Sequence, residues 1–213
     1  MQVLPVINCL DLECVIKTLQ QIERFLPPDG WIHLDIADGR FTFHKTWNEP
    51  SLWPNLRCSH SLEVHLMTEE PAATARGWLE NGARRIIVHY EVLTADGFKT
   101  LLNLTNAYGA EVMLAFNPET PAEALRPYFG RLKSYQVLAV HPGAAGQTFL
   151  PLVLPKISFL RREVPDAKIE VDGGITPAIA KKVKEAGATA ITSAYYVLAA
   201  HDPAAAYIEL TRI

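Results

Sequence analysis

The sequence predicts an α/β protein folded as one closed (β/α)8 barrel, a TIM barrel, that occupies residues 1–213 as a single domain. Eight short runs rich in Val, Ile, Leu and Ala recur at fairly even spacing, and each is apolar enough to be buried on both faces of a parallel sheet. Amphipathic segments of helical period separate these runs. No low-complexity stretch or composition break marks a linker. Eight such units make a barrel, on the small side for this fold.

The strand candidates are the eight apolar runs Gln2–Ile7, Trp31–Asp35, Ser61–Leu66, Arg84–His89, Glu111–Phe116, Tyr135–His141, Lys168–Asp172 and Thr189–Thr192. A doubly wound open sheet is the alternative architecture. It is less favoured because no Gly-x-Gly-x-x-Gly motif follows the first run.

Capping signals place the helices between the strands. Asp11 is a suitable N-cap for a first helix whose apolar stripe comprises Val15, Ile16, Leu19, Ile22 and Leu26. The segment Thr120–Glu123 has the form of a capping box with proline at the first helical position. Thr176 and Pro177 start a later helix that Gly187 can end.

Composition limits the class of partner. The formal net charge is −3 and no basic cluster is present, so the chain predicts a small-molecule partner and no nucleic-acid surface. No long apolar run or signal-like start indicates a membrane or secreted protein. Cys9, Cys14 and Cys58 are odd in number and lack Cys-x-x-Cys spacing, so we expect neither a disulfide framework nor a thiolate zinc site. A reduced, cytoplasmic setting follows as the expectation.

Polar side chains stand at the ends of three apolar runs. His33 and Asp35 are two residues apart, so both face the same side of a strand, and His65 and Asp172 end two further runs. On a barrel these ends meet at one mouth. Any one such histidine is more often a hydrogen-bonded core residue than a ligand. Two carboxylates and two imidazoles together are most easily buried around a divalent cation.

Five segments in order resemble the signature segments of the ribulose-phosphate 3-epimerase family. They are His33–Gly39, Glu63–Met67, Asn117–Pro121, His141–Phe149 and Glu170–Gly174. The resemblance spans nearly the whole chain. It implies a ribulose-phosphate-binding barrel, one divalent metal such as zinc, iron(II) or manganese, and interconversion of D-ribulose 5-phosphate with D-xylulose 5-phosphate. Its metal ligands carry over to His33, Asp35, His65 and Asp172.

The implied chemistry is removal and return of the proton at C3 of the ketose. A cation that bridges the two sugar oxygens stabilises the enediolate. Inversion needs one acid/base on each face of a planar intermediate, and we expect Asp35 and Asp172 to serve as this pair.

Substrate binding is expected from the loops at the mouth. The residues concerned are Met67, as an apolar wall, and Gly143, Gly146, Gln147, Gly173, Gly174, Ala194 and Tyr195, as the phosphate-binding set. The chain departs from the family here. Ala144 and Ala145 stand where the family usually has Phe-Gly, and Ala194-Tyr195 replaces Gly-Ser. A Cβ at Ala194 crowds the approach of a phosphate, and Val6 replaces a substrate-contacting serine.

The roles of several residues and the identity of the substrate stay open at this point. His89 and His141 also end strand candidates, and the resemblance gives neither a ligand role, so each either contacts substrate or makes ordinary hydrogen bonds. His44 and Lys45 could supply new substrate contacts or be solvated loop residues. The alternatives to a pentulose-phosphate epimerase are an epimerase with another ketose such as a hexulose phosphate, a related barrel lyase, or a non-catalytic homologue. We expect a homo-oligomer.

Overall fold

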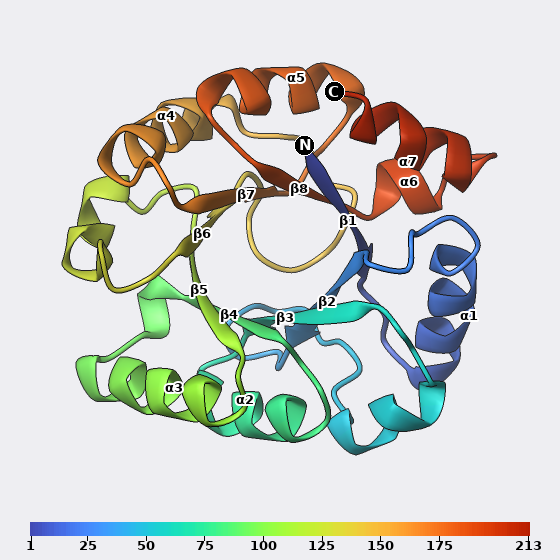
Figure 1. The fold of residues 1–213 in the computed structure, drawn as a ribbon, viewed down its shortest axis with the longest axis horizontal. Coiled ribbons are helices and arrows are strands. Elements are labelled where there is room, and N and C mark those ends of the chain that lie inside the picture. Colours follow the sequence, from blue (N-terminus) through green and yellow to red (C-terminus); the bar gives the residue numbers. More distant parts are fainter.

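The computed structural model describes residues 1–213 and contains a closed barrel of eight parallel strands (Figure 1). The strands follow one another around the ring in chain order. They are β1 (Gln2–Ile7), β2 (Trp31–Ala37), β3 (Ser61–Met67), β4 (Arg85–His89), β5 (Glu111–Phe116), β6 (Ser134–Leu138), β7 (Lys168–Asp172) and β8 (Ala190–Ser193). The prediction of a (β/α)8 barrel is confirmed.

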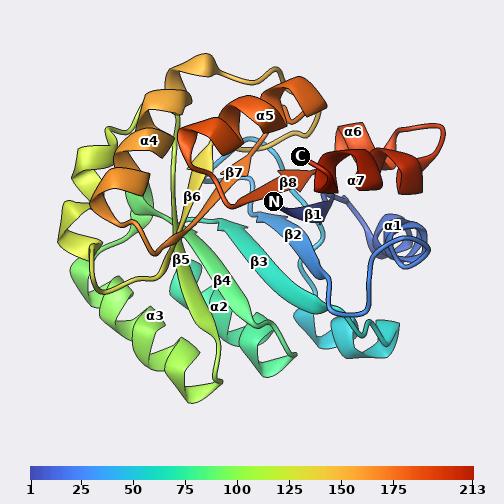
Figure 2. The same ribbon diagram turned by 45° about the horizontal axis from the view of Figure 1, so that its top comes forward.

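Helices surround the ring on its outer side in both views (Figure 2). The α-helices are α1 (Leu12–Ile22), α2 (Pro71–Glu80), α3 (Ala95–Ala107), α4 (Leu154–Glu163), α5 (Pro177–Ala186), α6 (Tyr195–Leu198) and α7 (Pro203–Thr211). The 3-10 helices are η1 (Pro50–Leu56), η2 (Tyr90–Val92), η3 (Ala122–Tyr128) and η4 (Pro151–Val153). None of the helices combines the length and the apolar character needed to span a bilayer.

Local capping confirms two of the predicted helix boundaries and corrects one. Asp11 caps α1 by accepting a hydrogen bond from the amide of Cys14 (2.8 Å), and Thr176 caps α5, which ends at Gly187 with φ +114°. The predicted capping box at Thr120 is wrong. Its hydroxyl donates to Glu91 instead, and the segment that follows forms η3, because Pro127 lacks an amide for a continuous α-helix.

Two crossovers therefore lack the α-helix that the repeated pattern predicts. η1 connects β2 to β3 and contains Pro50 and Pro54, and η3 connects β5 to β6. The strand candidates are otherwise displaced by few residues, except that β6 ends at Leu138 rather than at His141.

The number and spacing of the cysteines predicted no disulfide framework, but one disulfide is present. Cys9 and Cys14 are joined by a disulfide, with their Cα atoms 5.6 Å apart, and Cys58 is free. The turn capped by Asp11 folds the start of α1 back over the end of β1, so five residues of separation suffice. Spacing rules for metal-binding or redox pairs do not detect such a turn.

Inside the barrel the two halves differ. Ile87, Met113, Ala115 and Leu138 form a small buried apolar cluster on β4, β5 and β6. Strands β2, β3 and β7 carry buried charged side chains instead, and the register places His65 beside Ile87 and Asp172 beside Leu138. Strand register sets this pattern: His33 lies beside Glu63, and Asp35 lies beside His65.

Candidate active site and metal centre

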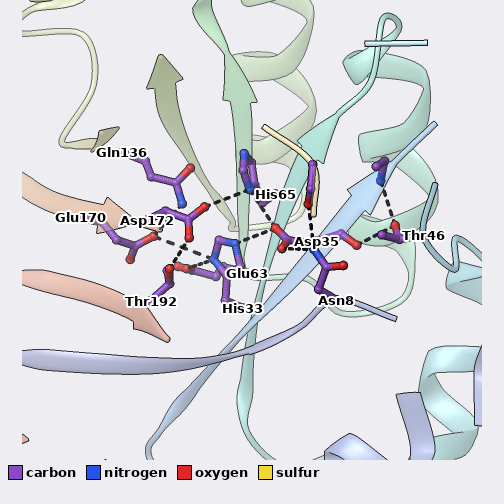
Figure 3. A network of polar contacts seen from close by, with 12 residues as sticks. Asn8, His33, Asp35, Thr46, Glu63, His65, Gln136, Glu170, Asp172 and Thr192 are labelled. Carbon is purple, nitrogen blue, oxygen red and sulfur yellow. Dashed lines mark hydrogen bonds and ion pairs between the residues drawn. The ribbon is translucent and has the colours of Figure 1, made fainter. Parts of the chain in front are cut away.

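Six inward-facing polar residues of β2, β3 and β7 form two layers at the mouth of the barrel (Figure 3). Each strand contributes two of them, spaced by two residues so that both face the interior. The layer nearer the mouth consists of Asp35, His65 and Asp172, and the layer below consists of His33, Glu63 and Glu170.

Four of these side chains converge. One ligand-capable atom each from His33, Asp35, His65 and Asp172 lies within 4.8 Å of the others. Oδ1 of Asp35 accepts hydrogen bonds from Nε2 of His33 (3.1 Å) and Nδ1 of His65 (2.9 Å), and Oδ2 of Asp172 lies 3.7 Å from the same His65 nitrogen.

The two carboxylates of this cluster differ electrostatically. Burial opposes ionisation of Asp35, but the hydrogen bonds and charges of His33 and His65 outweigh it and hold the pKa of Asp35 far below its ordinary value. Burial, followed by the negative charge of Asp35, raises the pKa of Asp172. Asp172 is therefore the carboxylate that holds a proton more readily.

The lower layer supports the upper one through His33. Nδ1 of His33 donates to Glu63 (2.7 Å), and Nη1 of Arg85 donates to the other oxygen of the same carboxylate (2.6 Å). Burial opposes the charge on Glu63, but these partners lower its pKa to about 2. Burial likewise opposes charge on His33, yet Asp35 and Glu63 together raise the pKa of His33 well above its usual value.

Glu170 completes the lower layer. Nε2 of Gln136 donates to its Oε1 (3.2 Å), and Nζ of Lys168 lies 3.3 Å from its Oε2. Burial and the nearby charge of Glu63 raise the pKa of Glu170 to about 7. The floor of the site is thus a charge network in which Arg85 and Lys168 balance the two glutamates.

His65 has a partner behind it as well. Its Nε2 lies 2.8 Å from Nε2 of His89, whose Nδ1 lies 3.4 Å from Glu91. Phe41 packs on the His89 ring with centroids 4.5 Å apart. Burial lowers the pKa of His89 to about 4, so this imidazole is neutral at pH 7.

The donor set fits a divalent cation. Each imidazole of the cluster presents one nitrogen to the other three ligands and has its second nitrogen held by a group behind it, Glu63 for His33 and His89 for His65. Histidine ligands of metals are held by such outer partners. A cation would also offset the repulsion between Asp35 and Asp172.

A cavity of about 690 Å³ opens onto this cluster. Asp35, His65 and Asp172 line it, whereas His33 is fully buried beneath. In Figure 1 the loop between β6 and α4 lies over the barrel opening, and residues of that loop line the cavity. No lysine or arginine lines the cavity, so an anion there would be held by backbone amides and neutral side chains.

The comparison with known proteins identifies the family. The model described as the Ribulose-phosphate 3 epimerase family matches residues 3–198. The chain belongs to this family. It is 33% identical to the ribulose-phosphate 3-epimerase of Chlamydia pneumoniae over 92% of this chain and 87% of that protein. It is 36% identical to the chloroplastic ribulose-5-phosphate-3-epimerase of Arabidopsis thaliana over 83% of this chain and 64% of that protein.

Solved structures agree on the fold. A 3-hexulose-6-phosphate synthase has a TM-score of 0.74 at 16% identity, over 100% of this chain and 99% of that one. Orotidine 5'-phosphate decarboxylase from Pyrococcus horikoshii OT3 has a TM-score of 0.69 at 15% identity, over the full length of both chains. At these identities the likeness shows the barrel alone.

The substrate-binding residues expected from the epimerase resemblance all line the cavity. They are Met67, Gly143, Gly146, Gln147, Gly173, Gly174, Ala194 and Tyr195. Gly173 and Gly174 also have structural reasons to be glycine. Their φ angles are +109° and +67°, and a Cβ would lie 2.4 Å from Val140 and from the backbone nitrogen of Phe149, respectively.

The histidines and the lysine left open are now placed. His141 is exposed, lies 3.3 Å from Glu119 and lines the cavity outside the metal-ligand cluster, so contact of His141 with substrate stays a prediction. Lys45 is an exposed loop residue that does not line the cavity. His44 donates to Oδ1 of Asn8 (3.1 Å) above the cluster. His89 contacts His65 from behind and does not line the cavity.

Four polar residues that hold the cluster were not predicted from the sequence. Asn8 and Thr192 donate to Asp35 and Asp172, and Glu63 and Glu170 lie two residues before His65 and Asp172. The period of two that places His33 and Asp35 on the same side of a strand also applies to both glutamates and could have identified them. Asn8 directly follows β1, so its position at a strand end was a signal of the kind used for the other site residues.

His89 gives a pH prediction. Its folded pKa of about 4 lies below its ordinary value of 6.5, so the neutral ring contributes stability that is complete above pH 6.5 and is lost as the pH falls toward 4. One pKa unit corresponds to about 1.4 kcal/mol, and pH 5 lies about 1.5 units below the ordinary pKa of 6.5. The contribution of the neutral ring to the free energy of unfolding is therefore smaller by about 2 kcal/mol at pH 5 than above pH 6.5. Urea unfolding at pH 7.5 and 5 should show a smaller loss for His89→Gln than for the wild type. Equal losses would contradict this assignment.

Proposed function

We propose that this epimerase-family protein interconverts D-ribulose 5-phosphate and D-xylulose 5-phosphate by moving the proton at C3 between two carboxylates. The observation that carries the proposal is the convergence of His33, Asp35, His65 and Asp172 within 4.8 Å at the mouth of the cavity, in a chain of this family. Two carboxylates in one cavity, on β2 and β7, are what inversion through a planar intermediate requires.

His33, Asp35, His65 and Asp172 would hold one divalent cation. When bound, such an ion supplies Lewis-acid stabilisation of negative charge on the sugar oxygens. Two imidazoles and two carboxylates are a donor set that suits zinc, iron(II) or manganese. The lower layer fixes the orientation of His33 through Glu63, and His89 does the same for His65.

The two carboxylates have different resting states. Asp35, whose pKa is far below its ordinary value, is ionised, and Asp172, whose pKa is raised, holds a proton more readily. One carboxylate removes the C3 proton from one face of the sugar, and the other returns a proton to the opposite face.

The phosphate is proposed to lie against the backbone amides of Gly173, Gly174, Ala194 and Tyr195, because no lysine or arginine lines the cavity. Gly146 and Tyr195 face each other across this end, since a Cβ on Gly146 would lie 3.9 Å from the Tyr195 ring. Met67 supplies an apolar wall, and Gln147 donates to the carbonyls of His141 and Ala144, which holds the loop over the cavity.

A proton-exchange assay tests substrate and reaction together. Protein loaded with Mn²⁺, Zn²⁺ or Fe²⁺ is incubated in D₂O with ribulose 5-phosphate, a hexulose 6-phosphate or unphosphorylated ribulose, and deuterium at C3 is followed by NMR. We expect exchange with ribulose 5-phosphate and at least a 100-fold lower kcat/KM for ribulose. Exchange with the hexulose phosphate alone would favour the altered-substrate alternative, and metal binding with no exchange on any sugar would overturn the proposal.

We also propose a cytoplasmic location, supported by the match to the cytoplasmic isoform of ribulose-phosphate 3-epimerase in Oryza sativa subsp. japonica, which is 30% identical over 81% of this chain and 77% of that protein. The single Cys9–Cys14 disulfide departs from the reduced cysteines that are usual in that compartment. Assembly into a homo-oligomer stays a prediction.

A further inference from the structure

Asn8 is a polar residue at the mouth with no role in the reaction described so far. It follows β1 directly, and the register that places Ile7 beside Leu34 puts Asn8 next to Asp35. Its side chain lines the cavity and points at the Asp35 carboxylate (Figure 3).

The amide of Asn8 makes three hydrogen bonds, each to a different segment. Nδ2 donates to Oδ2 of Asp35 (2.8 Å) and to the carbonyl oxygen of Gly143 (3.2 Å). Oδ1 accepts from Nε2 of His44 (3.1 Å). The bonds therefore join the end of β1 to the catalytic carboxylate, to the loop after β6 and to the loop after β2.

The two oxygens of Asp35 have separate partners. Oδ1 accepts from His33 and His65, whereas Oδ2 accepts from Asn8 alone among side chains. A carboxylate anchored at one oxygen can still rotate about the bond to its Cβ, because terminal torsions of this kind are broad. The second bond, from Asn8, removes that freedom and fixes which way Oδ2 faces.

The two loops joined by Asn8 also contact each other. The hydroxyl of Thr42 donates to the carbonyl oxygen of Pro142 (3.0 Å), and a Cβ on Gly143 would lie 2.8 Å from that hydroxyl. The loop after β2 is anchored at its far end as well, where the hydroxyl of Thr46 donates to the carbonyl oxygen of Asp35 (2.8 Å). Asn8 is thus the side chain that joins both loops to the carboxylate of Asp35, whereas Thr46 holds the backbone of that residue.

We propose that Asn8 is a positioning residue for Asp35. It holds Oδ2 in its orientation and, through His44 and Gly143, links that orientation to the placement of the two loops over the cavity. An amide suits this task because it donates to a carboxylate and has no proton to exchange with it. The catalytic part of the inference rests on the proposed function, whereas the orientation of a metal-capable carboxylate does not.

The test compares Asn8→Leu with Asn48→Leu. Leucine is close to asparagine in size and lacks both polar atoms. Asn48 lies in the loop after β2 and accepts a hydrogen bond from Trp78 (2.9 Å), but it makes no hydrogen bond to a member of the cluster, so it controls for the loss of one amide contact. Full-length proteins are titrated with Co²⁺ by calorimetry, kcat and KM for ribulose 5-phosphate are measured, and Tm is recorded.

We expect Asn8→Leu to lower both Co²⁺ affinity and kcat by about 10- to 100-fold, with KM changed less than about threefold. His44→Ala should show a smaller loss of the same kind, and His44→Gln, which retains a donor, should recover part of it. Asn48→Leu should change Tm without changing Co²⁺ affinity.

A purely structural role for Asn8 predicts a lower Tm with Co²⁺ affinity and kcat within twofold of wild type, and that result would overturn the inference. A wild-type protein that binds Co²⁺ but exchanges no C3 proton would contradict the proposed function without contradicting the inference about Asn8. In that case the Co²⁺ affinities of Asn8→Leu and Asn48→Leu still decide whether Asn8 orients Asp35.

Discussion

Asp35→Asn and Asp172→Asn should each abolish exchange of the C3 proton, with kcat lowered by at least about 1,000-fold. General acid/base groups contribute about 10²- to 10⁴-fold, and both carboxylates also belong to the metal-ligand cluster. The measurement is deuterium incorporation from D₂O into ribulose 5-phosphate and, separately, into xylulose 5-phosphate. Full activity in either variant would remove the two-carboxylate mechanism.

The two variants should differ in stability although both lose activity. Asp172 has a raised pKa because of burial and the charge of Asp35, so a neutral amide at this position relieves a cost, and the free energy of unfolding should stay equal or rise. Asp35 is stabilised as an anion by His33 and His65, so Asp35→Asn should destabilise the protein. Asp202→Asn, which keeps the exposed cap of α7, is the control for a change of charge.

Glu63→Leu should lower the free energy of unfolding by about 3–5 kcal/mol, because it removes one partner from a buried ion pair and leaves the other charges uncompensated. Glu63 is fully buried, and its two oxygens separately hold His33 and Arg85. Urea unfolding at pH 7.5, in the presence of a chelator, measures the loss without a contribution from bound metal.

Glu111→Gln provides the matched control. Glu111 pairs with the same Arg85, but its side chain is 59% exposed, so its loss should cost less than about 1 kcal/mol. Similar losses for the two variants would show that burial does not govern this network.

The four proposed metal ligands were easier to predict from the sequence than the residues that hold them in place by hydrogen bonds. His33, Asp35, His65 and Asp172 stand at strand ends, and the period of two places their side chains inside, so the barrel brings them together without further information. Asn8 and Thr192 also stand at or near strand ends, but their partners could not be predicted, because a hydrogen bond to a carboxylate depends on side-chain torsions and on loops from distant parts of the chain.

Helix type and strand ends were less predictable for a related reason. The Thr120–Glu123 segment satisfies the capping-box pattern, but the competing carboxylate of Glu91, distant in sequence, takes the Thr120 hydroxyl. The run that continues to His141 is apolar beyond Leu138, yet only the residues up to Leu138 belong to β6. Hydrophobicity alone does not mark where pairing stops.

The complete burial of His33 beneath the cavity has a consequence for the order of events. Behind it lie the glutamates and the arginine of the barrel floor, so an ion held by His33 would enter and leave through the cavity in which we propose that the sugar binds. We therefore expect metal loading to precede substrate binding, and bound sugar to slow the removal of the ion by a chelator.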